Sequence, residues 1–200
     1  MSIETAVEGG SLSILANQTE IDGWIGTQEI SKAEDVLEQI SNLLKKNNIK
    51  KEQIKVISVS RGAGSLTGEK IGLAIARGLA KSFNCRLAEI SVFESLLMEL
   101  RAKTRGIYLT AVPSSKNHVQ WQIFSPDNDF SHKKNSNPQI SDKEEFAEKI
   151  KKIDVQKVFL SSGFHNFYDK SVYRYTKSDI AISSHSLAKL NGLATFRCVR

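Results

Sequence analysis

The amino-acid sequence has few of the features that mark secreted, metal-binding or membrane-spanning chains. Its 200 residues include only two cysteines, Cys85 and Cys198, which lie far apart and match no metal-binding spacing. No apolar run approaches the length of a membrane span. The N-terminus lacks the basic segment followed by an apolar stretch that marks a secretory signal. We therefore expect a reduced, cytoplasmic protein that has no membrane association.

Motifs for zinc or nucleophilic catalysis are missing as well. The four histidines, His118, His132, His165 and His185, are scattered and form no His-Glu-x-x-His pair. No serine lies in a Gly-x-Ser-x-Gly elbow, and neither cysteine has the local signature of a protease nucleophile. His165 follows a predicted strand and is the best single candidate for a site residue, but a loop histidine more often makes an ordinary hydrogen bond. We therefore name no catalytic residue and no metal ligand.

Basic residues outnumber acidic residues by 28 to 22, which gives a formal net charge of +6. Such an excess is compatible with a role beside RNA. However, Lys45, Lys46, Lys50, Lys51 and Lys55 surround the end of a predicted helix, where cations interact favourably with the helix dipole. No basic run is interleaved with aromatic residues that could stack on bases. A solvated basic surface is therefore a better interpretation than direct recognition of RNA.

Hydrophobic periodicity predicts the order β-β-β-α-β-α-β-α for the first half of the chain. Ser31 and Glu34 form a capping box at the start of the first helix. The predicted strands are a short one ending near Glu4, then Ser11–Asn17, Glu20–Thr27, Lys55–Ser60 and Arg86–Ser91. The predicted helices are Ser31–Asn47, a helix from the glycine-rich segment to Phe83, and Phe93–Lys103.

A smaller second half is predicted from Gly106 onward, which divides the chain into residues 1–105 and 106–200. Little apolar content makes Ser125–Ser141 an exposed, mobile loop in this interpretation. We expect Ser178–Leu190 to be helical at least in part. The remaining predictions are a hairpin of Ile107–Val112 and Val119–Phe124, a helix over Lys143–Ile153 and a buried strand over Lys157–Ser162.

A strand, a glycine loop and a helix meet at Val56–Gly72, which is an arrangement that suits phosphate groups. The spacing departs from a P-loop, because five residues separate Gly62 from Gly68 and the next residue is Glu69 rather than lysine. The third glycine of a Rossmann fingerprint would fall at Thr67. We therefore interpret the glycines mainly as a sharp turn, with phosphate binding as the less favoured alternative. Its contacts would be Gly62, Gly64, Ser65, Thr67 and Gly68.

The helix after the glycine loop carries a stripe of small residues, Gly68, Gly72, Ala76 and Ala80, at intervals of four. Such a stripe lets a neighbouring helix approach closely. Apolar residues on several faces of the helix indicate burial on several sides. One face must cover the protein's own sheet. The pattern alone leaves open whether another face packs on the first helix or on a partner.

The segment Arg61–Ala80, RGAGSLTGEKIGLAIARGLA, resembles the GPGSFTGLRIGLA and AKGLA pattern of the TsaB (YeaZ) family. Three other stretches are similar to the family's opening strands, to its VSSLEAL segment and to a late strand ending in glycine. They are Ser2–Ala6 with Ser11–Leu15, Ser91–Leu96 and Val158–Gly163. The resemblance implies an α/β, actin-like fold (RNase H-like, ASKHA), with a mixed sheet flanked by helices and a smaller second α/β half.

The resemblance also implies a function. Proteins of this family lack a working active site and pair with a catalytic paralogue, TsaD, which transfers a threonylcarbamoyl group to the adenosine beside the anticodon of tRNA. The implied partners are a TsaD-like paralogue, a TsaE-like ATPase and a second copy of the chain, with tRNA reached only through the complex. No cofactor is implied for the isolated chain, and ATP and metal are left to the partner complex.

The family uses its first two helices for pairing, which implies an interface in this chain and a test by the substitution Ala76→Arg. The implied interface residues are Val36, Leu37, Ile40, Leu44, Gly72, Leu73, Ala76, Arg77 and Ala80. The chain departs from the family pattern at several positions, such as Ala63 in place of proline, and we expect these differences to alter which partner it binds. The chain ends before the family's usual tail, so we do not expect the docking element that the family carries there.

Glu4 occupies the position at which ATPases of the actin-like fold carry an aspartate that helps to hold the metal and nucleotide. A single acid without visible partners is weak support for a metal site, so we expect a structural role for Glu4. Two alternatives to the scaffold function remain at this point. One is an actin-like ATPase or kinase remnant that binds nucleotide at the glycine loop. The other, which is less favoured, is a metallopeptidase of the old glycoprotease type.

Overall fold

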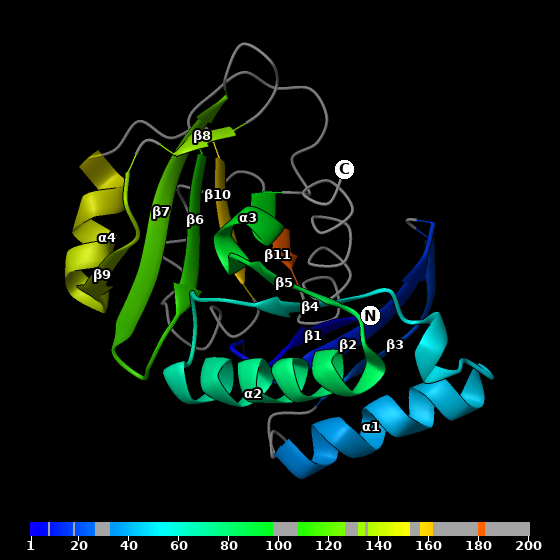
Figure 1. The fold of residues 1–200 in the computed structure, drawn as a ribbon. Helices are drawn as coiled ribbons and strands as arrows, with labels where there is room; N and C mark the ends of the chain where they lie inside the picture. Colours follow the sequence, from blue (N-terminus) through cyan, green and yellow to red (C-terminus); the bar gives the residue numbers. More distant parts are fainter. Residues whose placement is uncertain are drawn as a thin grey trace.

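The chain folds into two β-sheets with helices packed against them (Figure 1). The structure is a computed structural model, and the architecture below is that of the residues it describes. These are residues 1–7, 9–17, 19–26, 33–97, 108–126, 132–134, 136–152, 157–161 and 180–182.

The first sheet has five strands in the order β3-β2-β1-β4-β5. β1 is central, antiparallel to β2 and parallel to β4, and β3 and β5 form the two edges. Ser58 donates its backbone N–H to the carbonyl of Met1, which extends the β1–β4 pairing to the first residue. The strands are β1 Ser2–Glu4, β2 Ser11–Ala16, β3 Thr19–Ile25, β4 Val56–Ser60 and β5 Arg86–Ile90.

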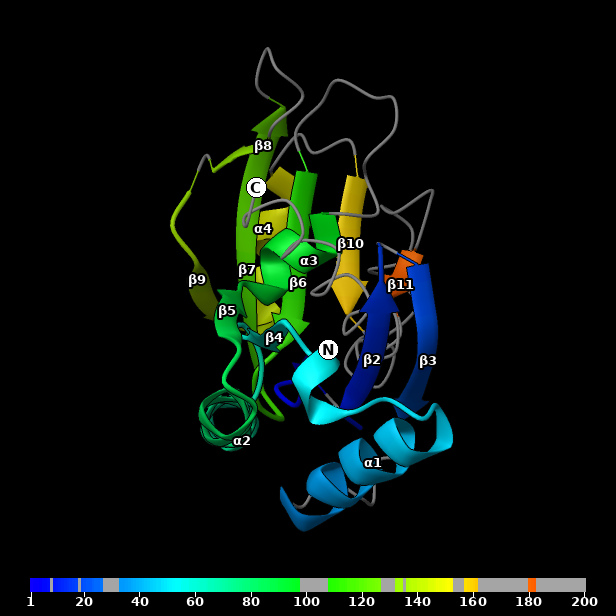
Figure 2. The same cartoon turned by 45° about the vertical axis from the view of Figure 1, so that its right-hand side comes forward.

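Two helices, α1 (Ala33–Lys46) and α2 (Leu66–Phe83), lie side by side over one face of the first sheet (Figures 1 and 2). Period-two alternation in the strands and helical spacing in α1 and α2 direct apolar side chains to a common core. α2 ends at Asn84, which adopts the left-handed conformation with φ 51°. The fully or nearly buried core residues include Ile3, Leu12, Ile57, Val59, Val36, Ile40, Ile75 and Ala76.

The alternate residues of the inner strands give the first sheet an unusual second face, which is buried and lined by small polar side chains. Ser2 is paired with Ser13 on one side and with Ser58 on the other. Glu4 is opposite Ser11 in the next row of the same face. All of these residues are at most 2% exposed. The alternation of apolar and serine residues in the sequence therefore builds one apolar and one polar buried face.

The second sheet has the strand order β11-β10-β6-β7-β8, and β9 also pairs with β7. α4 (Lys143–Lys152) covers one face, where Phe146 and Trp121 place their ring centroids 6.0 Å apart. α3 (Val92–Leu97) contacts β6 and β10. The strands are β6 Tyr108–Pro113, β7 His118–Pro126, β8 His132–Lys134, β9 Gln139–Asp142, β10 Lys157–Ser161 and β11 Ile180–Ile182.

The prediction of an exposed, mobile loop over Ser125–Ser141 is wrong. β8 lies within this segment, β9 overlaps its end, and both strands pair with β7. Ser136 between them is tied to β7 as well: its carbonyl accepts from Gln122 Nε2 at 2.7 Å, and its hydroxyl accepts from Ile123 N at 3.0 Å. These short outer strands need few apolar residues, since backbone pairing to β7 holds them. The amino-acid composition of the segment therefore did not predict β8 and β9.

Within Ser178–Leu190, which was predicted to be helical at least in part, Ile180–Ile182 form β11, which pairs in parallel with β10, and the other residues lie outside the described ranges. A short apolar run such as Ile180–Ile182 does not distinguish a buried strand from part of a helix. The other predicted elements are confirmed with bounds that differ by a few residues. The end of the helix predicted to reach Lys103, the cap at Ser31 and the domain boundary near 105 lie outside the described residues.

Within the described part of the chain, no helix is long and apolar enough to span a membrane. The strands of the first sheet come from residues 2–90, and those of the second come from residues 108–182. A hydrogen bond of 3.3 Å from Gly64 N to the side chain of Gln120 on β7 joins the glycine loop to the second sheet. The glycine loop therefore lies where the two sheets meet.

Candidate functional site

The glycine loop connects β4 to α2, and Ser65 caps the helix. The Ser65 hydroxyl accepts a hydrogen bond from Gly68 N at 3.3 Å, and its backbone carbonyl accepts from Glu69 N at 2.9 Å. Glu69 in the first turn interacts favourably with the positive end of the helix dipole. The acid that weakened the phosphate interpretation is thus a normal element of a stable helix start.

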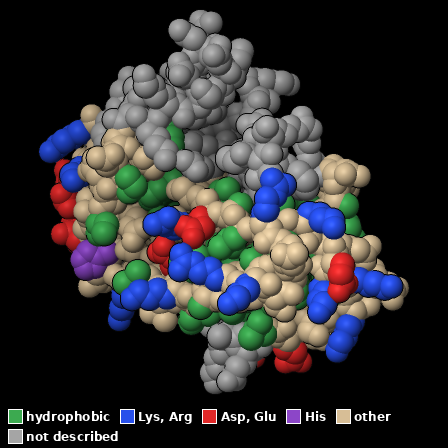
Figure 3. Space-filling model, in the orientation of Figure 1, with side chains coloured by type: hydrophobic (Ala, Val, Ile, Leu, Met, Phe, Trp, Pro, Cys, Tyr) green, Lys and Arg blue, Asp and Glu red, His purple; other side chains and the backbone are tan. Residues whose placement is uncertain are grey.

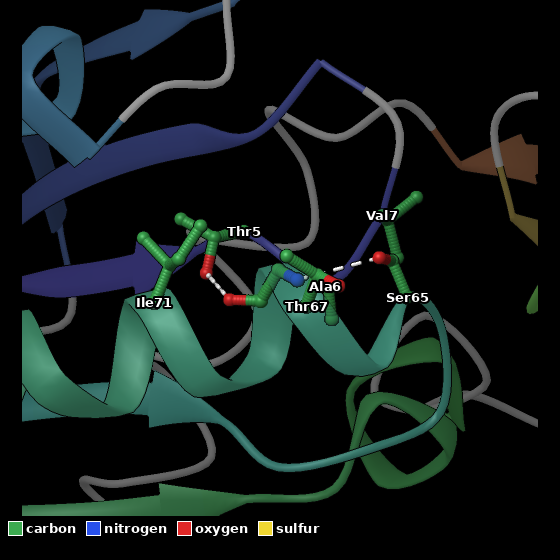
Figure 4. Close-up of a pocket in the computed structure, with 7 residues that line it drawn as sticks. Thr5, Ala6, Val7, Ser65, Thr67 and Ile71 are labelled. Carbon is green, nitrogen blue, oxygen red and sulfur yellow. Dashed lines mark hydrogen bonds between the residues drawn. The ribbon is translucent and has the colours of Figure 1, made fainter.

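The turn between β1 and β2 packs directly on the start of α2 (Figure 4). Ser65 N donates to the carbonyl of Ala6 at 2.7 Å. Thr5 Oγ1 donates to the carbonyl of Gly68, in the first turn of α2, at 2.8 Å. The two segments therefore meet closely, through one backbone–backbone bond and through the Thr5 hydroxyl.

This close approach explains three of the glycines. A Cβ atom on Gly64 would lie 2.3 Å from the carbonyl oxygen of Ala6, and one on Gly68 would lie 2.0 Å from that of Thr5. A Cβ atom on Gly72 would lie 2.1 Å from Thr5 Oγ1. Gly64 also has a φ of 129°, which side chains rarely allow. The glycines form a seat for the β1–β2 turn, which agrees with the interpretation of the loop as a turn.

Glu4 organises the same turn from the inside. Its side chain is fully buried, and Oε1 accepts from Ala6 N at 2.6 Å and from Val7 N at 3.0 Å. The Ser60 hydroxyl, at the end of β4, donates to Oε2. A carboxylate that accepts several hydrogen bonds is well stabilised in a buried position. These bonds agree with the structural role expected for Glu4.

Three backbone N–H groups of the loop and the first helical turn have acceptors within the chain. Gly64 N donates to Gln120, Ser65 N to Ala6, and Gly68 N to the Ser65 side chain. A phosphate cradle requires such donors to point at the ligand. These three donors already have acceptors, which weighs against the nucleotide-binding alternative.

The hollow beside the loop has a volume of about 210 Å³, below the range of about 300–1,000 Å³ that is usual for small-molecule sites. Ser65, Thr67 and Gly68 are lining residues, whereas Gly62 and Gly64 are not. No group of three or more His, Cys, Asp or Glu residues in the described ranges could hold a metal ion. The full lining is Thr5, Ala6, Val7, Ser65, Thr67, Gly68 and Ile71 (Figure 4).

The small-residue stripe of α2 faces the protein's own sheet. Gly72 meets Thr5 and Val59, Ala76 is fully buried, and Ala80 is 8% exposed. An arginine at Ala76 would therefore disrupt the core of the chain, and the substitution cannot serve as a test of pairing. Close helix packing at this stripe is used internally, since the sheet and the β1–β2 turn already occupy it.

The other predicted interface residues divide into two groups. Val36 and Ile40 are buried in the core beneath α1, and Leu44 packs partly against it. Leu37, with 44% of its surface exposed, and Arg77 remain accessible, and Leu73 is half-buried. The accessible surface of α1 and α2 is thus only part of the set expected from the sequence.

Some contacts near the loop have little signal in the sequence. Glu89 on β5 bridges two arginines: its Oε2 lies 2.7 Å from Arg61 Nη1, and its Oε1 lies 3.3 Å from Arg77 Nη2. Both arginines are largely exposed, so the bridge positions side chains more than it stabilises the fold. Long-range contacts of this kind depend on the β4–β5 register, which brings Val59 opposite Glu89.

Asp22 forms a second polar link, between the edge strand β3 and the end of α1. Its carboxylate accepts from Asn47 Nδ2 at 2.8 Å and lies 2.9 Å from Lys46 Nζ, and it also accepts from Gly23 N at 2.9 Å. The Asn47 bond, the Lys46 ammonium and the Gly23 amide lower the pKa of Asp22 to about 2. This link fixes the position of α1 on the first sheet.

The histidines and cysteines form no catalytic group among the described residues. His118 is exposed at the start of β7, with Nδ1 3.0 Å from the Ser115 hydroxyl. Burial raises the pKa of the Cys85 thiol, which makes it less reactive. His165, His185 and Cys198 lie outside the described ranges.

Comparisons with other proteins bear on the class of this chain. The family model for TsaD, tRNA N6-adenosine threonylcarbamoyltransferase, matches residues 29–119. The tRNA threonylcarbamoyladenosine biosynthesis protein TsaB of Buchnera aphidicola is 27% identical over 66% of this chain and 61% of its own length. The tRNA N6-adenosine threonylcarbamoyltransferase of Porphyromonas gingivalis is 25% identical over 46% of this chain and 31% of its own length. The chain thus spans less than two thirds of either relative.

Solved structures give the fold. YeaZ from Pseudomonas aeruginosa superposes with a TM-score of 0.67 at 16% identity, covering 99% of this chain and 92% of that one. The ethanolamine utilization protein EutJ from Carboxydothermus hydrogenoformans gives 0.54 at 10% identity, covering 95% and 87%. The mixed sheet with α1 and α2 on one face and the second sheet beyond the glycine loop define an actin-like, ASKHA-fold protein. Within that class, the chain is similar in sequence to TsaB of Buchnera aphidicola and in fold to YeaZ of Pseudomonas aeruginosa.

Proposed function

We propose that this chain is a non-catalytic scaffold in the synthesis of threonylcarbamoyladenosine, where it holds a TsaD-like paralogue that modifies the adenosine next to the anticodon of tRNA. The observation that carries the proposal is the internal use of the polar groups at the glycine loop. Glu4 holds the β1–β2 turn, and the amides of Gly64 and Ser65 have acceptors within the chain. The likeness to TsaB supports the pathway.

The partner surface in this proposal is the solvent side of α1 and α2. Leu37 on α1 is 44% exposed, and Leu73 and Arg77 of α2 are at least partly accessible. Next to Leu73 and Arg77 in the sequence, Ala74 and Gly78 are exposed, and nothing lies within 4 Å of a Cβ placed on Gly78. Small residues with open space above them allow another helix to approach closely.

The proposal includes three protein partners: a TsaD-like paralogue, a TsaE-like ATPase and a second copy of this chain. tRNA would be reached through the complex, and ATP and metal would bind in the partners. The internal acceptors of the Gly64, Ser65 and Gly68 amides support this division.

Co-purification with the cognate TsaD-like protein tests the proposal, together with a threonylcarbamoylation assay with and without this chain. We expect Leu37→Glu and Ala74→Glu each to weaken the complex about tenfold or more, because a charge would be buried on association. Ile140→Glu is the matched control, since Ile140 is 64% exposed on β9 in the second sheet. Each variant should keep the melting temperature of the parent protein.

Two results would contradict the scaffold function. One is full modification of tRNA by the partners when this chain is omitted. The other is saturable micromolar binding of ATP with Mg²⁺ by the isolated chain in calorimetry, which would favour the nucleotide-binding alternative. Equal binding by the parent and both α1–α2 variants would place the partner surface elsewhere.

A further inference from the structure

A depression at the C-terminal end of α1 has no part in the glycine loop or in its contacts. Its volume is about 460 Å³. We call it the α1-end depression, and it is lined by Ser41, Leu44, Lys45, Asn48, Ile49 and Lys50.

The end of the helix creates this depression. Asn48 adopts a φ of 53°, in the left-handed region that ends many helices. Its N–H donates to the carbonyl of Lys45 at 3.1 Å, and Ile49 N donates to that of Leu44 at 2.9 Å. The chain thereby turns back and brings Ile49 beside Leu44. Both side chains are half-buried against the first core and supply an aliphatic floor.

Lysines border this floor. Lys45 and Lys50 are exposed, and neither forms an ion pair with any residue that the structure describes. Two neighbouring lysines differ: Lys46 Nζ lies 2.9 Å from Asp22, and Lys55 Nζ donates to the carbonyl of Glu52 at 2.9 Å. Figure 3 shows blue side chains at the right, where α1 ends, as well as across the middle of the same face. The charge of Lys45 and Lys50 is thus available to a partner.

We propose that the α1-end depression is a docking site for an acidic peptide segment that carries two adjacent apolar side chains. These side chains would rest on Leu44 and Ile49, and carboxylates beside them would meet Lys45 and Lys50. Charge complementarity selects an acidic ligand. The aliphatic floor favours a peptide over RNA, because it has no aromatic ring on which a base could stack.

The probe is a fluorescein-labelled peptide with the one-letter sequence EELFEE, titrated with the full chain and followed by fluorescence anisotropy. We expect saturable binding. The peptide EESSEE, which has the same charge and no apolar side chain, should bind about tenfold more weakly. The double variant K45E/K50E should also lose about tenfold or more, because carboxylates would then face like charges.

The control variant K70E/K116E makes the same change of charge at two exposed lysines, on α2 and in the β6–β7 turn, outside the depression. It should bind EELFEE within about twofold of the parent protein. The neutral variant K45Q/K50Q should show an intermediate loss. It keeps the test valid if reversal of two charges alters the fold in circular dichroism.

Four results would overturn the proposal. They are absence of binding by the parent protein, equal binding of EELFEE and EESSEE, equal losses in K45E/K50E and K70E/K116E, and tighter binding of an oligouridine hexamer that depends on Lys45 and Lys50. The second and third would indicate non-specific attraction to the net positive charge, and the fourth would indicate a nucleic-acid surface. The test does not depend on the TsaD-like partner, so its failure would leave the scaffold proposal unaffected.

Discussion

At the scale of single residues, glycines in α2 have opposite structural roles although they share one helix. Gly68 and Gly72 lie under the β1–β2 turn, and a Cβ on either would approach an atom of Thr5 to 2.0 or 2.1 Å. Gly78 has nothing within 4 Å of such a Cβ. Glycine is therefore required at Gly68 by the approach of the Thr5 carbonyl and at Gly72 by that of the Thr5 hydroxyl, whereas at Gly78 it costs the helix conformational entropy.

This difference gives a matched pair of substitutions. Gly68→Ala should lower the free energy of unfolding by about 1–3 kcal/mol, because the methyl group forces the Thr5 carbonyl away. Gly78→Ala should raise it by about 0.5–1 kcal/mol, since alanine is the better helix former. Urea denaturation measures both. A stabilising Gly68→Ala would contradict the seat that the glycines form for the β1–β2 turn.

At the scale of elements, Asp22 joins β3 to the C-terminal end of α1 through Asn47 and Lys46. Both partners favour the ionised carboxylate, and the pKa of Asp22 is lowered from 3.8 to about 2. The carboxylate is charged in the folded protein at pH values where the unfolded chain has begun to bind a proton. Its contribution to stability is therefore present above pH 3.8 and is lost as the pH falls towards 2.

We expect Asp22→Asn to flatten the loss of stability within that acidic window. The asparagine cannot attract the Lys46 ammonium, so the variant should also be less stable than the parent at neutral pH. Thermal unfolding of both proteins from about pH 2 to about pH 7 measures the difference. Parallel curves for the two proteins across the whole range would show that Asp22 does not couple protonation to folding.

At the scale of the whole molecule, the glycine loop links the two sheets through Gly64 N and Gln120 Oε1, which are 3.3 Å apart. The bond lies next to the contact between Ser65 and Ala6. One segment thus touches the β1–β2 turn of the first sheet and β7 of the second. Its integrity should depend on both.

Gln120→Ala should lower the free energy of unfolding by about 1 kcal/mol, the net value of a typical hydrogen bond. It should also speed amide hydrogen exchange at Gly64, because the donor loses its acceptor. Ser114→Ala in the exposed β6–β7 turn is the control and should leave exchange at Gly64 unchanged. Unchanged exchange in Gln120→Ala would mean that the bond does not protect the loop.

The short-range patterns predicted most of the elements correctly. Apolar spacing and cap residues act within a few residues of chain, which is why the order from β1 to α3 and the helix over Lys143–Lys152 follow from the sequence. The outer strands β8, β9 and β11 were not predicted from the sequence. Their stability depends on pairing with β7 or β10, and such pairing leaves little trace in local composition.

The candidate site was likewise predicted only in part. Residue spacing predicted a glycine turn, a helix after it and a small-residue stripe, because these features depend only on the local sequence. Only packing decided what each of them contacts. The stripe at Gly72 and Ala76 lies against the chain's own sheet and the β1–β2 turn, and the amides of the loop donate to Ala6 and Gln120. These acceptors lie far away in sequence, so their positions depend on strand order and register, which arise when the sheets assemble.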